Sequence, residues 1–409
     1  MSLILEKADR LRVLHLVSVP FRPEEGVSRA ATEIAIHTAA NVDSHLAADQ
    51  PVGDAFVGLH RLVRWKPWPM MVGRELRQLI DRVEPDLVHL HGGIVVSALA
   101  LAPASRRVPV VASIYQLLPV PLRELGVRHF GDARRSAVRP TRIAASKVVG
   151  GPLTRQFLAD GTISVVCTPD PRVAAYLRAS GPVVSVQGGA SPSTLNARWA
   201  DQPTIGFAGR AERGRGVEEL IAGFEVLRRD MPHVRLRLML LPGPAATEWI
   251  AQYAGNPNIE LSVGVHPSLD RELARCQLVA LPFRIPATIT PPLVAAQAMS
   301  VGVPVVATAL SCMTPLVRSG FNGMLTPSIN PNDLADAFRA VLRDKTSWEE
   351  LSVGARTTIE TEWNWATAAS ATERAYSIAL DRTANDSRRV VVDRRMTSWS
   401  DSPAVGASS

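Results

Sequence analysis

Short apolar runs alternate with amphipathic segments along most of this chain. In the first half, the apolar runs cover residues 12–20, 85–92, 108–115, 162–170 and 181–189. The segments between them carry apolar residues at helical spacing, over residues 28–40, 72–83, 94–102, 141–159 and 171–180. Fully apolar strands that alternate with helices predict a parallel sheet with helices on both of its faces.

The alternation restarts after a polar, turn-rich stretch at residues 190–203, in which we place a linker at 193–203. The next apolar runs predict strands at residues 204–210, 234–241, 259–264, 277–282 and 303–308. Helical patterns cover residues 217–229, 268–274, 292–300 and 332–380. The chain is therefore predicted to be an α/β protein with two parallel-sheet domains. Ligands are expected in the cleft between them, beyond the carboxyl ends of the strands.

These patterns also predict where the parts of the chain begin and end. We expect a Rossmann-like domain over residues 1–192, the linker, a second such domain over 204–361, and a final helix over 362–380. Residues 381–409 lose helical periodicity and end in small polar side chains, which predicts a disordered tail.

The composition supports a large core and narrows the range of partners. Of 409 residues, 46% are hydrophobic, and 45 basic residues against 38 acidic ones give a net charge of +7. This charge balance suits phosphate-bearing ligands or an anionic membrane surface. It is equally explained by compositional drift in an Arg-rich proteome. Three widely spaced cysteines predict neither disulfides nor a zinc site, which fits a reducing, cytoplasmic location. The opening MSLILEKADR does not resemble a secretory signal.

Residues 288–308 are almost wholly apolar and about as long as a membrane span. Prolines at positions 291, 292 and 304, together with Gly302, interrupt any such helix. The β-branched residues 303–308 are typical of a strand. We therefore expect a helix, a turn and a buried parallel strand.

The loop GFAGRAERGRG, residues 206–216, is the most informative spacing in the sequence. A strand ends at Arg210, a short loop follows, and Arg215 precedes the glycine that opens a helix. Backbone N–H groups at a helix start and two guanidinium groups suit a diphosphate. The loop matches neither a dinucleotide fingerprint nor a P-loop, because it has no G-x-G-x-x-G after the first strand and no G-K-[ST].

Six motifs in order over residues 12–380 resemble glycosyltransferase family 4, whose members are retaining enzymes with the GT-B fold. They are RVLHLVSVPFRPEEGVSRAATEIA from residue 12, PDLVHLHG from 85, VVSVQGGAS from 183, GRAERGRG from 209, LVAAQAMSVGVPVVAT from 293 and EWNWATAASATERAY from 362. The last is similar to the helix that in this family crosses back to the first domain. The resemblance assigns the acceptor side to the first domain and the donor nucleotide sugar to the second.

The resemblance implies transfer of a sugar from a UDP- or GDP-sugar to an acceptor hydroxyl, with retained anomeric configuration. The acceptor would be a glycan, a lipid-linked sugar or a small molecule, which suits polysaccharide biosynthesis. The family needs no metal and no cofactor. Its two diphosphate-binding cations correspond here to Arg210 and Arg215, with arginine in the usual place of lysine at 215. Gly26 is expected to let the backbone approach the donor.

The chain departs from the family where sugar and ribose are recognised. The two glutamates of its E-x7-E motif are Ile289 and Gln297 here. Gln297 can still accept from a ribose hydroxyl, in a neutral bond about half as strong as a charge-assisted one. Pro291 and Pro292 lack an N–H, which leaves Leu293 and Val294 as backbone donors at the helix start.

Further expectations concern the first domain. His91, at the carboxyl end of a predicted strand, is either an acceptor or sugar contact or a hydrogen-bonded core histidine. Tyr115 stands where many family members have a histidine. Residues 60–82 interleave basic residues with Trp65 and Trp68, which suits either peripheral contact with the inner face of a membrane or packing onto the domain. No pattern resembles a nucleic-acid module.

Two functions are compatible with these residues. The first is an active glycosyltransferase with altered sugar contacts. The second is a catalytically degenerate relative that binds a nucleotide or a partner. The first is favoured because two cations are kept where the leaving diphosphate would lie.

Overall fold

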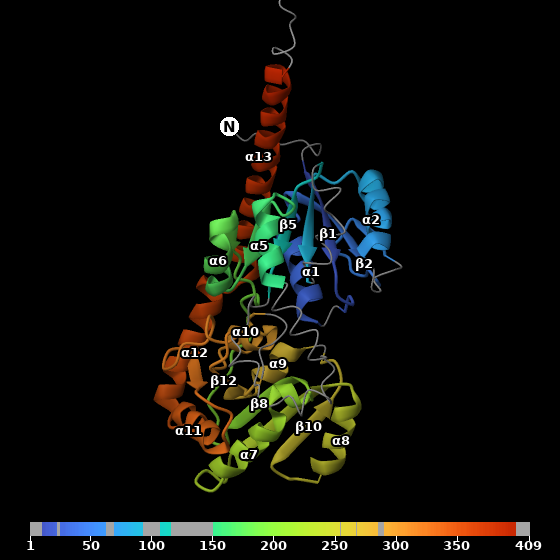
Figure 1. Ribbon diagram of the computed structural model, residues 1–409. Helices are drawn as coiled ribbons and strands as arrows, with labels where there is room; N and C mark the ends of the chain where they lie inside the picture. The colour runs from blue at the N-terminus through green and yellow to red at the C-terminus, as the bar shows by residue number, and fades with distance from the viewer. Residues whose placement is uncertain are drawn as a thin grey trace, which may run out of the picture.

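The computed structural model describes residues 10–397, apart from 23–24, 63–68, 93–106, 116–149, 254, 267 and 285–289. Its strands form two parallel sheets, one in each half of the chain. Figure 1 shows the two halves stacked, with the N-terminal half above the C-terminal half. The predicted α/β architecture with two parallel sheets is confirmed.

The described strands of the first sheet follow the order β3-β2-β1-β4-β5-β6-β7. They are β1 (Leu11–Val17), β2 (Val42–Ala48), β3 (Gly58–Arg61), β4 (Leu87–His91), β5 (Val110–Ser113), β6 (Val165–Thr168) and β7 (Val183–Ser185). The helices of this half are α1 (Gly26–Thr38), α2 (Pro69–Val83), α5 (Gly151–Ala159), α6 (Pro171–Leu177) and the short η5 (Arg178–Ser180). The strand order reverses direction between β1 and β4, where open α/β sheets commonly bind ligands.

The second sheet follows the order β10-β9-β8-β11-β12-β13 in the described residues. Its strands are β8 (Thr204–Arg210), β9 (Arg235–Leu241), β10 (Ile259–Val263), β11 (Leu278–Leu281), β12 (Val305–Thr308) and β13 (Gly323–Thr326). The helices are η6 (Arg213–Arg215), α7 (Val217–Leu227), α8 (Pro244–Tyr253), α9 (Leu269–Leu273), α10 (Leu293–Ser300), α11 (Pro331–Val341) and α12 (Lys345–Thr361).

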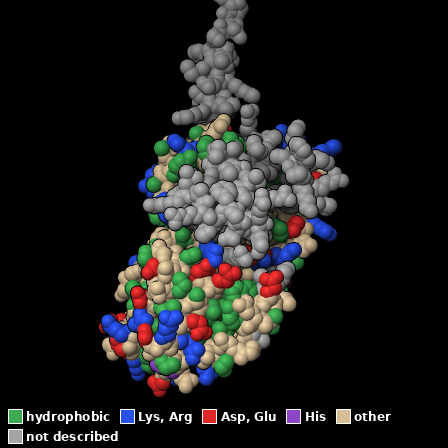
Figure 2. Space-filling view, turned by 60° about the horizontal axis from the view of Figure 1, so that its bottom comes forward, with side chains coloured by type: hydrophobic (Ala, Val, Ile, Leu, Met, Phe, Trp, Pro, Cys, Tyr) green, Lys and Arg blue, Asp and Glu red, His purple; other side chains and the backbone are tan. Residues whose placement is uncertain are grey.

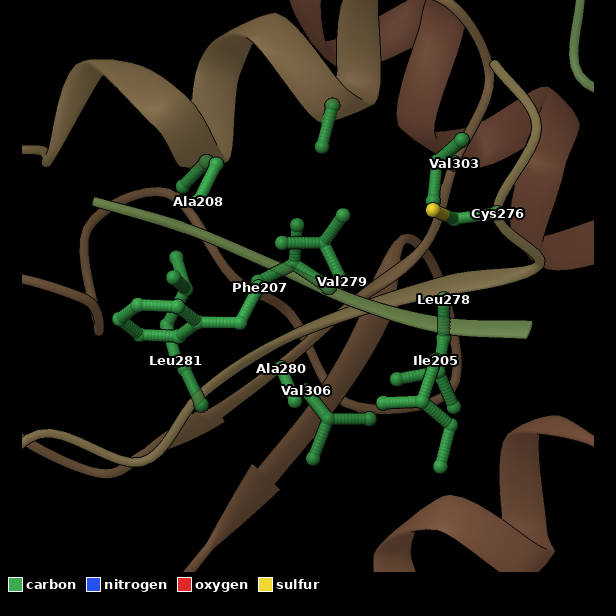
Figure 3. Close-up of a cluster of buried hydrophobic side chains, with 14 of the residues drawn as sticks. Ile205, Phe207, Ala208, Cys276, Leu278, Val279, Ala280, Leu281, Val303 and Val306 are labelled. Carbon is green, nitrogen blue, oxygen red and sulfur yellow. The ribbon is translucent and has the colours of Figure 1, made fainter. Parts of the chain in front are cut away.

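Apolar side chains from the central strands fill the core of the C-terminal half. Figure 3 shows Ile205 and Phe207 of β8 packed with Leu281 of β11 and Val306 of β12, all fully or almost fully buried. The strands are apolar on both faces because helices cover both faces, which is the expected sequence signature of a parallel sheet. The three cysteines are free and buried, so the prediction of no disulfide is confirmed.

The last helix, α13 (Trp365–Thr397), packs against the N-terminal half. It contacts α1 and the strands β5, β6 and β7, and Figure 1 shows it running along that half. The final helix was predicted to end at residue 380, but α13 continues to Thr397, and the disordered tail beyond it stays a prediction. Residues 381–397 contain no proline or glycine, so nothing in the backbone chemistry ends the helix there.

Several elements differ from the predicted ones. Three strands were not predicted. Polar residues interrupt β2 and β3, and β13 is only four residues long. Helix α8 was also not predicted. The expected helix at 94–102 lies outside the described residues. The residue boundaries of the domains stay a prediction. None of the described helices combines the length and apolar character that a bilayer crossing requires.

Candidate functional site

A cavity of about 490 Å³ lies between the two halves, at the carboxyl ends of the second sheet. Arg210 ends β8, Leu241 ends β9, and Gly264 directly follows β10. The opposite wall is the start of α1, which contributes Glu25, Gly26 and Arg29. The remaining lining residues are Phe207, Ala208, Gly209, Arg215, Met239, Val265, His266, Leu269, Phe283, Pro292, Leu293, Val294 and Gln297.

The cavity brings together most of the residues that the sequence singles out. Arg210, Arg215, Gly26, Leu293, Val294 and Gln297 all line it. His91 and Tyr115 are not among its lining residues. Ile289 lies outside the described residues, so its predicted place in the sugar subsite stays a prediction.

Local backbone geometry places Arg215 beside the cavity. The short helix η6 ends at Arg215, and Gly216 then takes a left-handed conformation with φ 70° before α7 begins. A Cβ on Gly216 would lie 1.8 Å from the carbonyl oxygen of Pro282, so only glycine fits. The guanidinium of Arg215 stacks over the ring of Phe283 at 4.6 Å from its centroid, in a cation–π contact.

The two arginines differ in how their charge is balanced. Among the described residues, no carboxylate forms an ion pair with Arg215. Burial lowers the pKa of the Arg215 guanidinium, and although Glu212 opposes the shift, the nearby positive charge of Arg210 adds to it. Arg210 is paired, because its guanidinium donates to the carboxylate of Glu25 on the other wall. An anion between the arginines would stabilise the charged form of both.

The start of α10, and not that of α7, faces the cavity. Pro292, Leu293, Val294 and Gln297 line it, whereas no residue of α7 does. The predicted phosphate donors at the start of α7 do not line this cavity, and their role stays a prediction. The first turn of that helix carries Glu218 and Glu219, both paired with Arg284.

The first turn of α10 offers unpaired groups to a ligand. No backbone acceptor is recorded among the described residues for the N–H groups of Leu293 and Val294. The side-chain amide of Gln297 likewise has no hydrogen-bond partner in the described part of the chain, although the residue is only 7% exposed. Because Leu293, Val294 and Gln297 line the cavity, these groups are available to a ligand there.

The other end of the cavity is apolar. Met239, Leu241, Val265 and Leu269 line it, and the Nε2 of His266 lies 3.2 Å from the hydroxyl of Ser262. Figure 2 shows basic and acidic side chains interspersed over the C-terminal half, with hydrophobic side chains gathered between them. On this face the net positive charge is not gathered into one broad patch. A flat apolar group beside a charged one would fit this cavity.

His91 lies in the core of the first sheet and is 1% exposed. Its Nε2 is 3.0 Å from Nδ1 of His15, and its Nδ1 is 2.9 Å from the hydroxyl of Tyr115. The Nε2 of His15 is 3.2 Å from the hydroxyl of Ser44. The chain Ser44–His15–His91–Tyr115 fits the interpretation of His91 as a hydrogen-bonded core histidine.

His89 is also buried, beside this chain of hydrogen bonds. Its two ring nitrogens lie 2.8 Å from the hydroxyls of Ser113 and Tyr376, the latter on α13. His15, His89 and His91 could together offer three ligands to a metal ion. Each ring nitrogen already has a hydrogen-bond partner, so a metal would have to displace bonds that satisfy the cluster.

Sequence reasoning missed four residues of the site. They are Glu25 as the partner of Arg210, Arg29, Phe283 under Arg215, and His266. Arg29 stands about one turn after Glu25, and this spacing is the signal that could have identified it from the sequence. The other three depend on contacts between residues far apart in the sequence.

Comparison with known proteins finds a family match in the C-terminal half. Residues 202–344 match the family described as glycosyl transferases group 1. This stretch contains β8 to β13 and therefore most of the cavity wall.

Two relatives named D-inositol 3-phosphate glycosyltransferase match this chain over different lengths. The D-inositol 3-phosphate glycosyltransferase of Nocardioides sp. is 32% identical over 181 residues, which is 40% of each chain. The enzyme of that name from Pseudarthrobacter chlorophenolicus is 23% identical over 393 residues, 87% of this chain and 88% of its own.

Solved structures share the fold over 90% of this chain. Sucrose-phosphate synthase from Thermosynechococcus elongatus matches with a TM-score of 0.68 and 16% identity, over 90% of this chain and 98% of that one. Anabaena Alr3699/HepE in complex with UDP and glucose matches with a TM-score of 0.66 and 17% identity, over 90% and 100%. The stretch that matches the family thus lies within a GT-B fold.

Proposed function

We propose that this chain is a retaining glycosyltransferase of the hexosyl type that uses a UDP- or GDP-sugar. One observation carries the proposal: Arg210 and Arg215 line a single cavity at the carboxyl ends of the second sheet, opposite the start of α1. A related fold holds UDP and glucose in HepE, which supports a nucleotide-sugar donor. The acceptor is the hydroxyl of a glycan, a lipid-linked sugar or a small molecule, as in polysaccharide biosynthesis.

The chemistry follows from where charge develops. The bond between the anomeric carbon and the diphosphate oxygen breaks, while the acceptor oxygen bonds to that carbon and its proton passes to the departing diphosphate. Negative charge grows on the diphosphate, so fixed guanidinium groups stabilise the transition state more than the ground state. Two such cations take the place of a metal ion in this proposal.

The remaining groups bind and orient the donor. The amide of Gln297 would bind a ribose hydroxyl, and the N–H groups of Leu293 and Val294 would bind phosphate or sugar oxygens. Gly26 would admit the donor against α1. Tyr115 is only partly buried and packs against the cluster that contains Leu293, so its hydroxyl would contact the sugar or acceptor. His91 would act through Tyr115.

A donor panel tests this function. UDP-glucose, UDP-N-acetylglucosamine, UDP-galactose and GDP-mannose are incubated with the chain, and released nucleoside diphosphate is measured with and without EDTA. We expect release from at least one donor, unchanged by EDTA and abolished by Arg215→Ala. NMR of a transfer product should show the anomeric configuration of the donor.

Two results would contradict the proposal. A product of inverted configuration excludes the retaining mechanism. Tight nucleotide binding without turnover of any donor or acceptor would contradict an enzyme and support the degenerate binding protein. That alternative is motivated by the replacement of the two family glutamates.

Peripheral membrane contact through residues 60–82 is a separate part of the proposal. Arg61, Arg74 and Arg77 are exposed there, while residues 65 and 68, the tryptophans, lie outside the described residues. Basic residues of this kind bind anionic lipid. Vesicles containing phosphatidylglycerol should co-sediment the chain and phosphatidylcholine vesicles should not, and equal recovery with both would contradict the contact.

A further inference from the structure

One side chain of the N-terminal half already occupies the phosphate subsite. The carboxylate of Glu25 is ion-paired with Arg210, 185 positions away in the sequence, and both residues line the cavity. Glu25 is the residue that precedes α1, but its side chain makes no capping hydrogen bond. Its carboxylate is therefore committed to the opposite wall of the cavity and not to its own helix.

A carboxylate and a phosphate compete for the same guanidinium. Both present oxygen pairs that match the planar fork of arginine. They also repel each other, so a diphosphate bound to Arg210 weakens the ion pair between Glu25 and Arg210. The side chains of Arg210 and Glu25 are 44% and 39% exposed, and ion pairs at that exposure are weak enough to exchange.

We propose that Glu25 sets the charge selectivity of the cavity, as an internal anion that the donor's diphosphate must displace. The inference rests on the proposed function, because it assigns the diphosphate to this cavity. A ligand that carries a diphosphate reaches both Arg210 and Arg215 and exchanges with Glu25. A nucleoside without phosphate has nothing to offer Arg210 and leaves the ion pair in place.

The displaced carboxylate has a second partner on its own helix. Arg29 lies four positions after Glu25 and also lines the cavity, where it pairs with Glu33 at 3.5 Å. Glu25 is the extended residue directly before α1 and Arg29 stands in the helix, so both lie on the same wall of the cavity and Glu25 can turn from Arg210 toward Arg29. Donor binding thereby removes a link between the two walls and replaces it with the ligand.

Calorimetric titration with UDP and GDP tests the exchange. The full chain, Glu25→Gln and a control, Glu362→Gln, are titrated with both nucleotides and with uridine and guanosine. Glu362 pairs with Arg318 at 2.9 Å, and these side chains are 42% and 44% exposed, so the control breaks a matched ion pair away from the cavity.

We expect Glu25→Gln to tighten binding of the preferred nucleoside diphosphate by about fivefold, the size of one exposed ion pair. The control should bind as the unmodified chain does, and nucleoside affinities should not change. Equal diphosphate affinity in Glu25→Gln and the unmodified chain, or weaker affinity in the variant, would contradict the proposed exchange but not the proposed function. If no form of the protein binds either diphosphate, the proposed function fails first and the exchange falls with it.

Discussion

The Nδ1 of His15 lies 3.0 Å from the Nε2 of His91, inside the first sheet. Burial lowers the pKa of His15 to about 3 and holds the pKa values of His89 and His91 well below the usual 6.5. Like charges on the neighbouring histidines act in the same direction. All three rings are therefore neutral in the folded protein.

This cluster predicts acid lability. Below pH 6.5 the histidines of the unfolded chain bind protons, whereas those of the folded cluster stay neutral. The contribution of the cluster to the free energy of unfolding is therefore present above pH 6.5 and is lost as the pH falls toward 3. Each histidine adds a slope of at most about 1.4 kcal/mol per pH unit. Urea unfolding at pH 7.5, 6 and 5 measures the total slope.

A single variant separates the cluster from the rest of the protein. His91→Asn should reduce the pH slope of the unfolding free energy relative to that of the unmodified chain. A free energy of unfolding that does not change from pH 7.5 to 5 would contradict this account of the cluster.

For kcat/KM, the positive charge of residue 215 should matter more than the shape of its side chain. Arg215→Ala removes a cation that stabilises the departing diphosphate, so we expect kcat/KM for the accepted donor to fall by about 100- to 1,000-fold. Arg215→Lys keeps the charge and should stay within about tenfold of the unmodified enzyme. Comparable losses in both variants, with unfolding free energies unchanged, would show that charge is not the determinant.

Gln297 offers a test of the ribose contact. In Gln297→Glu a neutral hydrogen bond to a ribose hydroxyl becomes charge-assisted, so nucleoside diphosphate affinity should rise by about fivefold. The matched 2′,3′-dideoxy nucleotide, which lacks the hydroxyls, serves as the control and should gain nothing. Weaker binding of the ordinary nucleotide to the variant would place Gln297 elsewhere in the site.

Gly216 should be required for the stability of the loop. Gly216→Ala forces a Cβ against the carbonyl of Pro282 and a side chain into a left-handed backbone. We expect a loss of at least about 2 kcal/mol in the free energy of unfolding. Gly255→Ala, where no heavy atom lies within 4 Å of the added Cβ, is the control. Similar stability in both variants would contradict the packing of this loop.

The sequence predicts the apolar framework well and the contacts across the cavity poorly. The strand predicted at 204–210 has the bounds of β8, because a doubly covered strand is apolar throughout. β2 carries Asp43, Ser44 and His45, and alternation of this kind near a sheet edge conceals a strand. Periodicity reports on burial, so it identifies central strands best.

The site shows the same division. Arg210 and Arg215 were identified from their spacing and family resemblance, and both line the cavity. The pairing of Glu25 with Arg210 and the stacking of Phe283 on Arg215 join distant segments, which periodicity does not report. His91 was identified by its place at a strand end, but strand position alone does not distinguish a cavity-facing side chain from one in a buried polar network.

A crystal structure of the chain with bound UDP or GDP tests the central claim most directly. The account predicts that diphosphate oxygens lie within about 3.2 Å of the guanidinium nitrogens of both Arg210 and Arg215, with Glu25 turned away from Arg210. A diphosphate bound away from these two arginines, or density for nucleotide elsewhere on the molecule, would contradict it.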